Sequence, residues 1–211
     1  MDRTDIFLGE SEWKVLESKY LFKNNFLTVR SDRVQLPTGV ILDNYFVIEN
    51  QDWVNVIALT KEGQFVLEKQ YRHGIRKIGV EICAGMIDDG ETPLQAAQRE
   101  LLEETGYGGG EWIVYGESTP NPASMTVTNY TYLAKNVEIL TEPSLEPAEN
   151  IEVFLASPNE VLHYLKMGYI SEGVMQAPLW RFFCKAVPAR TTMARALMPR
   201  QPYSVAVLST E

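Results

Sequence analysis

Alternating apolar and polar residues along much of the chain predict a structure that is rich in strands. β-branched and aromatic residues occupy many of the apolar positions, as is typical of half-buried strands. Strands are predicted at Trp13–Tyr20, Asn25–Leu36, Val40–Ile48, Trp53–Leu59, Gln64–Gln70, Gly79–Ala84, Glu111–Tyr115, Thr126–Ala134 and Ile151–Leu155. The segments Pro37–Gly39 and Thr60–Gly63 are typical of turns, so they join neighbouring strands into strand–turn–strand units.

A stretch with helical spacing, Pro93–Thr105, predicts a helix whose two ends are marked in the sequence. Thr92 is a candidate N-cap, Pro93 occupies the first helical position, and Gln95 completes a capping box. Gly106 is a stop signal, because glycine readily adopts the left-handed conformation that ends many helices.

A second helical pattern covers Pro158–Met167 and resumes from Glu172 to Cys184. Many strands with two or three helices favour an α+β sandwich over a doubly wound parallel sheet. We divide the chain into a β extension over residues 1–45, a main domain over 46–187 and a tail over 188–211. The tail receives no secondary-structure assignment.

Composition indicates a globular protein that is poorly suited to hold a polyphosphate directly. Apolar residues make up 45% of the chain and charged residues 22%, which allows an ordinary core and argues against disorder. The formal net charge of −9 disfavours a nucleic-acid partner. A divalent metal ion could still bring phosphates to such an acidic protein.

We expect a cytoplasmic protein with no membrane association. The two cysteines, Cys83 and Cys184, form no disulfide framework, so a reducing compartment is the default expectation. No apolar run reaches the roughly 18 residues of a membrane span. The N-terminal sequence has acidic residues where a signal peptide has basic ones, and it lacks an apolar central region.

Three glutamates gather on one face of the first predicted helix. At about 100° per residue, Glu100, Glu103 and Glu104 lie within about 100° of arc. Most such clusters are simply solvated. Here, however, the acids lie in the last turns, where the helix dipole disfavours them, and no basic residue follows four positions on. Clustered hard oxygens are what Mg²⁺ or Mn²⁺ binds.

The segment around these glutamates resembles the Nudix box. Its fixed positions are met by Gly85, Glu91, Arg99, Glu100, Glu103, Glu104 and Gly106 within the 23 residues from Gly85 to Tyr107. The resemblance extends roughly from Asn44 to Ala186. It implies a Nudix fold, a mixed β-sheet sandwiched between helices, here with a small N-terminal β-sheet extension.

The resemblance implies a metal-dependent pyrophosphohydrolase. The metal ligands that it implies for Mg²⁺, or for Mn²⁺, are Glu100, Glu103, Glu104 and the backbone carbonyl of Ala84. Arg99 would pair with Glu91 or with a ligating glutamate and so hold the loop on the helix. Gly85 would permit a tight backbone turn before the helix.

Residues outside the box resemble the ADP-ribose pyrophosphatase branch of the family. The sequence Gln70-Tyr71-Arg72 and the later Glu81 match that branch, which implies that Arg72 contacts a substrate phosphate and Glu81 lies beside the metal site. Trp53 would stack on the base, although a core or interface role fits it equally well. Cys83 replaces the more usual proline, and the loop Thr119–Asn129 lacks the usual acidic pair.

The general base is left open by the sequence. In this branch a late acidic loop often supplies it, and Glu149 matches that position, with Glu146 as the second candidate. A box glutamate such as Glu103 is a further catalytic candidate, and Arg99 would support it by position.

The favoured function is Mg²⁺-dependent hydrolysis of the pyrophosphate bond in a small nucleoside diphosphate derivative, either ADP-ribose or a nucleotide sugar. One alternative is a non-catalytic Nudix-fold module that binds a ligand. Another is a hydrolase of RNA ends or dinucleoside polyphosphates. The N-terminal extension resembles one that exchanges across a two-fold axis, which implies a homodimer.

Overall fold

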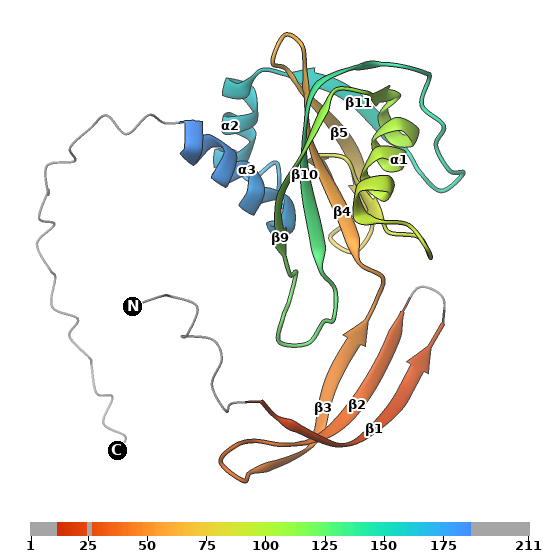
Figure 1. The fold of residues 1–211 in the computed structure, drawn as a ribbon, viewed down its shortest axis with the longest axis vertical. Coiled ribbons are helices and arrows are strands. Elements are labelled where there is room, and N and C mark those ends of the chain that lie inside the picture. Colours follow the sequence, from red (N-terminus) through yellow and green to blue (C-terminus); the bar gives the residue numbers. More distant parts are fainter. Residues whose placement is uncertain (1–11, 25–26, 187–211) are drawn as a thin grey trace, which may run out of the picture.

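The computed structural model describes residues 12–24 and 27–186, with side chains described as far as Cys184. The tail predicted over 188–211 and the first residues of the predicted extension lie outside this range. Within the described residues, two separate sheets and three helices are present, and Figure 1 shows the smaller sheet below the main body.

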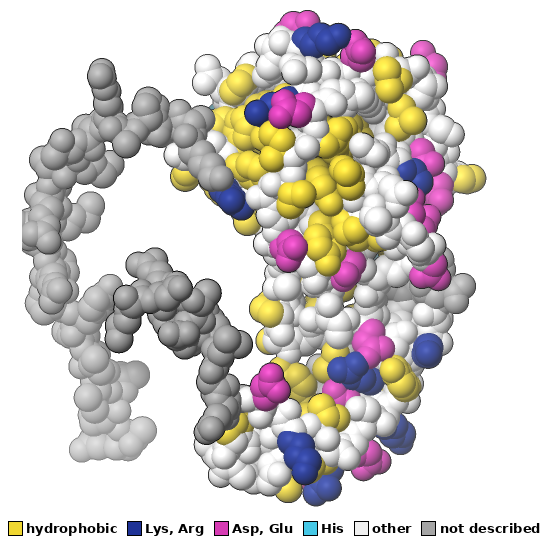
Figure 2. Space-filling model, in the orientation of Figure 1, with side chains coloured by type: hydrophobic (Ala, Val, Ile, Leu, Met, Phe, Trp, Pro, Cys, Tyr) yellow, Lys and Arg dark blue, Asp and Glu magenta, His cyan; other side chains and the backbone are white. Residues whose placement is uncertain are grey.

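The N-terminal sheet consists of three antiparallel strands in the order β1 (Lys14–Lys23), β2 (Thr28–Gln35) and β3 (Ile41–Glu49). Every residue of β1 is exposed, although this strand carries large hydrophobic side chains. The face seen in Figure 2 mixes hydrophobic side chains with basic and acidic ones. The sheet therefore lacks a core of its own on the β1 side.

The main sheet has eight strands and is mixed. Its central order is β11 (Ile151–Ala156), β5 (Phe65–Arg72), β4 (Trp53–Thr60), β10 (Asn129–Ile139) and β8 (Tyr107–Gly108). Three further strands extend it, with β6 (Lys77–Glu81) on β5, β7 (Ala84–Met86) on β4, and β9 (Glu111–Ser118) on β10. Only the β4–β10 pairing is parallel among these described strands.

Helices cover both faces of this sheet (Figure 1). α1 (Pro93–Thr105) packs on one face, and α2 (Pro158–Met167) and α3 (Gly173–Ala186) lie on the other. Successive side chains of β4 point to opposite faces of the sheet, so this strand contributes to the hydrophobic core on each face. Val54 and Val56 face the α1 side, while Ile57 faces the α2–α3 side. The arrangement is a three-layer sandwich. Among the described residues, no helix is long and apolar enough to cross a membrane.

The predicted ends of α1 are confirmed. The Thr92 side chain accepts a hydrogen bond from the Gln95 backbone N–H, and the Gln95 side chain accepts one from the Thr92 backbone N–H. Gly106 ends the helix with a φ of 74°, in the left-handed region. Both ends of α1 could be predicted from the local sequence, because each capping hydrogen bond joins residues only a few positions apart.

Several predicted element boundaries are wrong. The strand predicted over Gly79–Ala84 is two strands, because β6 pairs with β5 and β7 with β4, so the chain changes neighbours at Ile82 and Cys83. The strand predicted over Thr126–Ala134 is β10, which begins at Asn129 and ends at Ile139. It continues past an irregularity at Asn136, whose φ is 57°.

Candidate active site

One cavity of about 740 Å³ brings together the residues that the sequence singled out. It lies where β4, β5, β6, β7 and α1 meet the loops before β11 and α3. The predicted residues that line it are Trp53, Arg72, Glu81, Ala84, Arg99, Glu100, Glu103, Glu104, Glu146 and Glu149. Residues 96 positions apart in the chain therefore line one cavity.

The carboxylates of α1 enter this cavity to different depths. Glu104 is 5% exposed, and its Oε2 accepts a hydrogen bond from the Ala84 backbone N–H at 3.3 Å. Burial, together with the negative charge of Glu100, raises the pKa of Glu104 to about 7. Glu100 is half-buried, and burial raises its pKa as well, while Glu103 is exposed. The site therefore concentrates negative charge where water is scarce.

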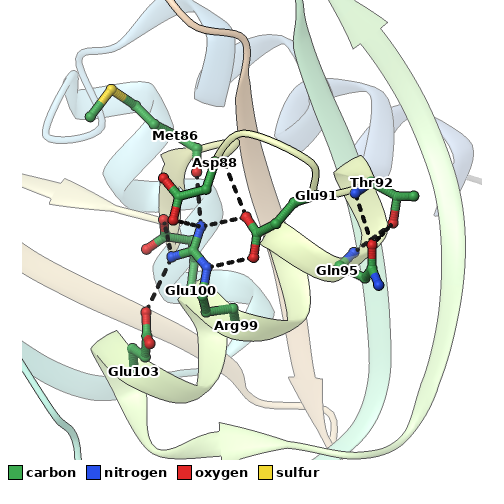
Figure 3. Close-up of polar contacts among 8 residues, drawn as sticks. All are labelled: Met86, Asp88, Glu91, Thr92, Gln95, Arg99, Glu100 and Glu103. Atoms are coloured by element: carbon green, nitrogen blue, oxygen red, sulfur yellow. Dashed lines mark hydrogen bonds and ion pairs between the residues drawn. The ribbon is translucent and has the colours of Figure 1, made fainter. Parts of the chain in front are cut away.

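Arg99 ties the box loop to the helix (Figure 3). Its guanidinium donates to Glu91 Oε1 at 2.8 Å, to Glu100 Oε1 at 2.8 Å and to Glu103 Oε2 at 3.2 Å. It also donates to the Met86 carbonyl at 3.0 Å. The hydrogen bond from Arg99 lowers the pKa of Glu91 to about 2.

The pairing expected between Arg99 and Glu91 is thus present. The alternative pairing, between Arg99 and a glutamate expected to bind the metal, is present as well. Arg99 precedes Glu103 by four positions and pairs with it, and it also pairs with its neighbour Glu100. The lack of a basic residue four positions after each glutamate therefore does not exclude an ion pair with a base that precedes the cluster.

Gly85 allows a close approach between strand β7 and helix α1. A Cβ at this position would stand 2.1 Å from the Glu100 carboxylate, closer than any real contact. The expected reason for this glycine, a tight turn, is wrong, because its φ is not in the left-handed region and it lies in a strand. The absent side chain makes room for Glu100.

Arg72 and Glu81 form a bidentate ion pair in the wall of the cavity. Arg72 Nε lies 2.9 Å from Glu81 Oε1, and Arg72 Nη2 lies 2.5 Å from Glu81 Oε2. Glu81 is buried, whereas the Arg72 side chain is 44% exposed. Glu81 thereby fixes the guanidinium while leaving part of it open to the cavity.

The cavity is also lined by Trp53, two buried amides and two residues of α3. Asn55 Nδ2 donates to the Val174 carbonyl at 3.0 Å, and Asn129 lies buried on the neighbouring strand β10. Val174 and Met175 complete this part of the wall. An aromatic ring, amides and apolar side chains are suited to a flat heterocycle.

The two base candidates lie on the loop before β11. The Glu146 backbone N–H donates to Glu149 Oε2 at 2.8 Å, so the loop forms a short turn that holds Glu149. The charge of Glu149 contributes to the raised pKa of both Glu100 and Glu104, and Glu149 lines the same cavity as these acids. The structure brings this loop to the cavity, as the sequence led us to expect.

Sequence analysis overlooked Glu172 and Glu68. Glu172 is half-buried in the cavity wall, and its backbone carbonyl accepts hydrogen bonds from Met175 and Gln176 at the start of α3. Burial and the charge of Glu81 raise its pKa. Glu68 shares the α1-facing side of β5 with Val66, and this break in an apolar alternation was a readable signal.

The donor set fits a hard divalent cation. Glu100, Glu103, Glu104 and the Ala84 carbonyl supply only oxygen atoms at the cavity wall. The raised pKa values of Glu100 and Glu104 show that burial leaves their negative charge poorly compensated without such an ion. The space that Gly85 leaves for the Glu100 carboxylate is part of the same arrangement.

Comparison with known families agrees with this geometry. A model of the NUDIX domain matches residues 50–176, more than half of the chain, and a model described as nucleoside diphosphate sugar hydrolase N-terminal domain matches residues 13–48. The chain belongs to the Nudix family, and it is a pyrophosphohydrolase by class. The predicted fold, a mixed sheet between helices with a small N-terminal sheet, is confirmed.

Its relatives include two bacterial proteins. A methanol dehydrogenase activator from Bacillus methanolicus is 31% identical over 158 residues, which cover 74% of this chain and 84% of that one. An ADP-ribose pyrophosphatase from Bacillus subtilis is 28% identical over 152 residues, covering 72% and 82%. A crystal structure of an ADP compounds hydrolase superposes with a TM-score of 0.73 at 20% identity, covering 83% of this chain and 95% of that one. This last likeness concerns the fold.

Proposed function

We propose that the protein hydrolyses the pyrophosphate bond of a nucleoside diphosphate linked to another group, with ADP-ribose or a nucleotide sugar as substrate and Mg²⁺ as the metal. Mn²⁺ is the alternative ion. The observation that supports this most is the single cavity that joins the box carboxylates to Arg72, Glu81 and Trp53. The match to a nucleoside diphosphate sugar hydrolase N-terminal domain and the names of the relatives support the substrate class.

In this proposal the box residues hold the metal. Glu100, Glu103, Glu104 and the Ala84 carbonyl are the ligands, and Arg99 positions Glu100 and Glu103 while pinning the loop at Met86. When bound, the ion neutralises phosphate oxygens and lowers the pKa of the attacking water. The protein's own contribution is to fix the acids in advance, so that little reorganisation is needed during the reaction.

The remaining residues orient the substrate. Arg72, held by Glu81, presents its guanidinium to a phosphate, and Trp53 stacks against the base beside the buried amides. Glu149 accepts the proton of the attacking water, because it lines the same cavity as the box acids and its charge acts on Glu100 and Glu104. Glu146 and Glu103 are the alternatives, both lining the same cavity.

A hydrolysis screen with Mg²⁺ tests the substrate class. Free ADP-ribose, nucleoside diphosphate sugars, dinucleoside polyphosphates and capped RNA are compared at equal concentration. We expect cleavage of the first two groups to exceed that of the others. Preference for capped RNA or dinucleoside polyphosphates would favour a different branch, and hydrolysis of none would favour the ligand-binding module.

Replacing Arg72 tests the phosphate contact. Arg72→Ala should raise KM more than it lowers kcat, because a phosphate contact made equally in the ground and transition states is uniform binding. We expect kcat/KM to fall roughly ten- to hundredfold, the range for a charge-assisted hydrogen bond. Arg72→Lys should recover part of the loss, since lysine lacks the planar fork.

The control for Arg72 is Lys69→Ala on the same strand. Lys69 pairs with Glu152 outside the cavity, and the two side chains are 42% and 68% exposed. Its removal should leave both kinetic constants near the wild-type values. Unchanged kcat/KM in Arg72→Ala would instead make Arg72 a surface charge of the strand, and the phosphate contact would have to be assigned elsewhere.

We further propose that residues 1–45 form a dimerising extension to a catalytic domain over 46–187. The exposed hydrophobic side chains of β1, including Val15, Tyr20 and Phe22, support burial against a second copy. Light scattering at micromolar concentration should give twice the 23.9 kDa chain mass. A monomer with full activity would contradict the dimer.

A further inference from the structure

A second cluster of groups that could bind a metal lies beneath the box helix and shares only Glu104 with the cavity wall. Glu68, Cys83 and Glu104 each offer one ligand atom, and these atoms all lie within 4.8 Å of one another. The three residues are 2%, 1% and 5% exposed. Glu104 lines the cavity, whereas Glu68 and Cys83 do not, so this cluster extends from the active site into the core.

Glu68 is the unusual member of this cluster. It occupies a core position on β5, and its Oε1 is buried without a hydrogen-bond partner among the described residues. The positive charge of Arg72 acts on Glu68, but the Arg72 guanidinium donates its hydrogen bonds to Glu81 and not to Glu68. A buried carboxylate with an unpartnered oxygen is costly unless a cation or a donor compensates it. The position of Glu68 therefore indicates a missing partner.

Cys83 determines which class of metal ion suits this cluster. It lies at the break between β6 and β7, and its sulfur lies within 4.8 Å of a Glu104 carboxylate oxygen. Magnesium selects oxygen ligands and gains little from sulfur. A thiolate beside carboxylates is a donor set for borderline or soft divalent ions, which bind sulfur strongly.

We propose that Glu68, Cys83 and Glu104 form a buried site for a transition-metal ion of the Zn²⁺ class. The ion would take the Cys83 sulfur and one oxygen from each glutamate, and a water or a second carboxylate oxygen would fill the fourth position. Coordination replaces the S–H proton, which leaves to solvent, so no oxidant or reductant is involved. Binding at this site does not depend on the proposed hydrolysis.

Occupancy of this site would oppose the activating metal, a consequence that rests on the proposed function. Glu104 is shared, so an ion held with Glu68 and Cys83 withdraws one carboxylate from the Mg²⁺ ligands. Zn²⁺ would then inhibit hydrolysis measured at saturating Mg²⁺. The binding site and the inhibition are measured separately, so failure of one is distinguishable from failure of the other.

Direct binding is tested with Cd²⁺ and Co²⁺ on the reduced, chelator-treated full-length protein. Both ions give a thiolate-to-metal charge-transfer absorption, a signal that requires a bound cysteine. We expect one equivalent per chain in the wild type. The two cysteines provide a matched pair: Cys83→Ser should lose the signal, and Cys184→Ser, which removes an exposed thiol, should keep it.

Glu68→Gln supplies an independent arm that leaves both thiols in place. It should weaken Cd²⁺ binding at least roughly tenfold, whereas Glu152→Gln, an exposed acid paired with Lys69, should not. Glu68→Gln and Cys83→Ser should also raise the Zn²⁺ concentration that halves Mg²⁺-supported hydrolysis. Circular dichroism checks folding, and Glu68→Gln decides the matter if Cys83→Ser fails to fold. Absence of the signal in the wild type, its persistence in folded Cys83→Ser, or unchanged affinity in Glu68→Gln would overturn the proposal.

Discussion

Glu104→Gln is expected to lower kcat by about two orders of magnitude or more, because it removes the most deeply buried charge at the proposed metal site. The amide keeps the size of the side chain and can still accept the Ala84 N–H hydrogen bond. Folding should survive, since one negative charge less near Glu100 and the helix C-terminus relieves repulsion. Steady-state kinetics with Mg²⁺, together with thermal unfolding, separates the two effects.

The control for this change is Glu111→Gln, which removes an exposed acid from the start of β9, outside the cavity. Its kinetic constants should match those of the wild type. The wild type in excess chelator should lose activity as well, and added Mg²⁺ should restore it. Full activity of Glu104→Gln, or of the chelated wild type, would remove the metal from the mechanism.

The parts of this site that follow from sequence are those whose partners are close in the chain. The capping box of Thr92 and Gln95, and the face shared by Glu100, Glu103 and Glu104, depend only on helical periodicity. The contact between Arg99 and Glu91 also lies within one loop–helix unit. These features do not depend on which strands pair or in which register.

Features that depend on strand register could not be predicted in the same way. Arg72 meets Glu81 because β5 and β6 form a hairpin with a particular register, and Glu68 lies opposite Glu81 in the same ladder. A shift of one residue would exchange the faces of these side chains. Glu172 reaches the cavity through the packing of α3 against the sheet, which no local pattern encodes.

Gly85→Ala is expected to lower kcat/KM by about two orders of magnitude with little loss of stability. The new methyl group would overlap the Glu100 carboxylate, which stands 2.1 Å from the ideal Cβ position. That carboxylate ends a flexible side chain, so it moves instead of the backbone, and it leaves both Arg99 and the proposed metal. Displacement of a catalytic group by about 1 Å can cost about a hundredfold in rate. Kinetics and thermal unfolding are measured on the same preparation.

Gly173→Ala is the matched control, because a Cβ there meets nothing within 4 Å and the glycine has no left-handed φ. As the first residue of α3, it should accept alanine with unchanged activity. A double variant, Glu100→Asp with Gly85→Ala, offers a second check. Its loss of activity should be smaller than the product of the two single losses. The reason is that the shorter aspartate side chain leaves space for part of the new methyl group. Wild-type activity in Gly85→Ala would show that the Glu100 carboxylate is not needed where the structure places it. Glu103, Glu104 and the Ala84 carbonyl would then have to hold the metal without it.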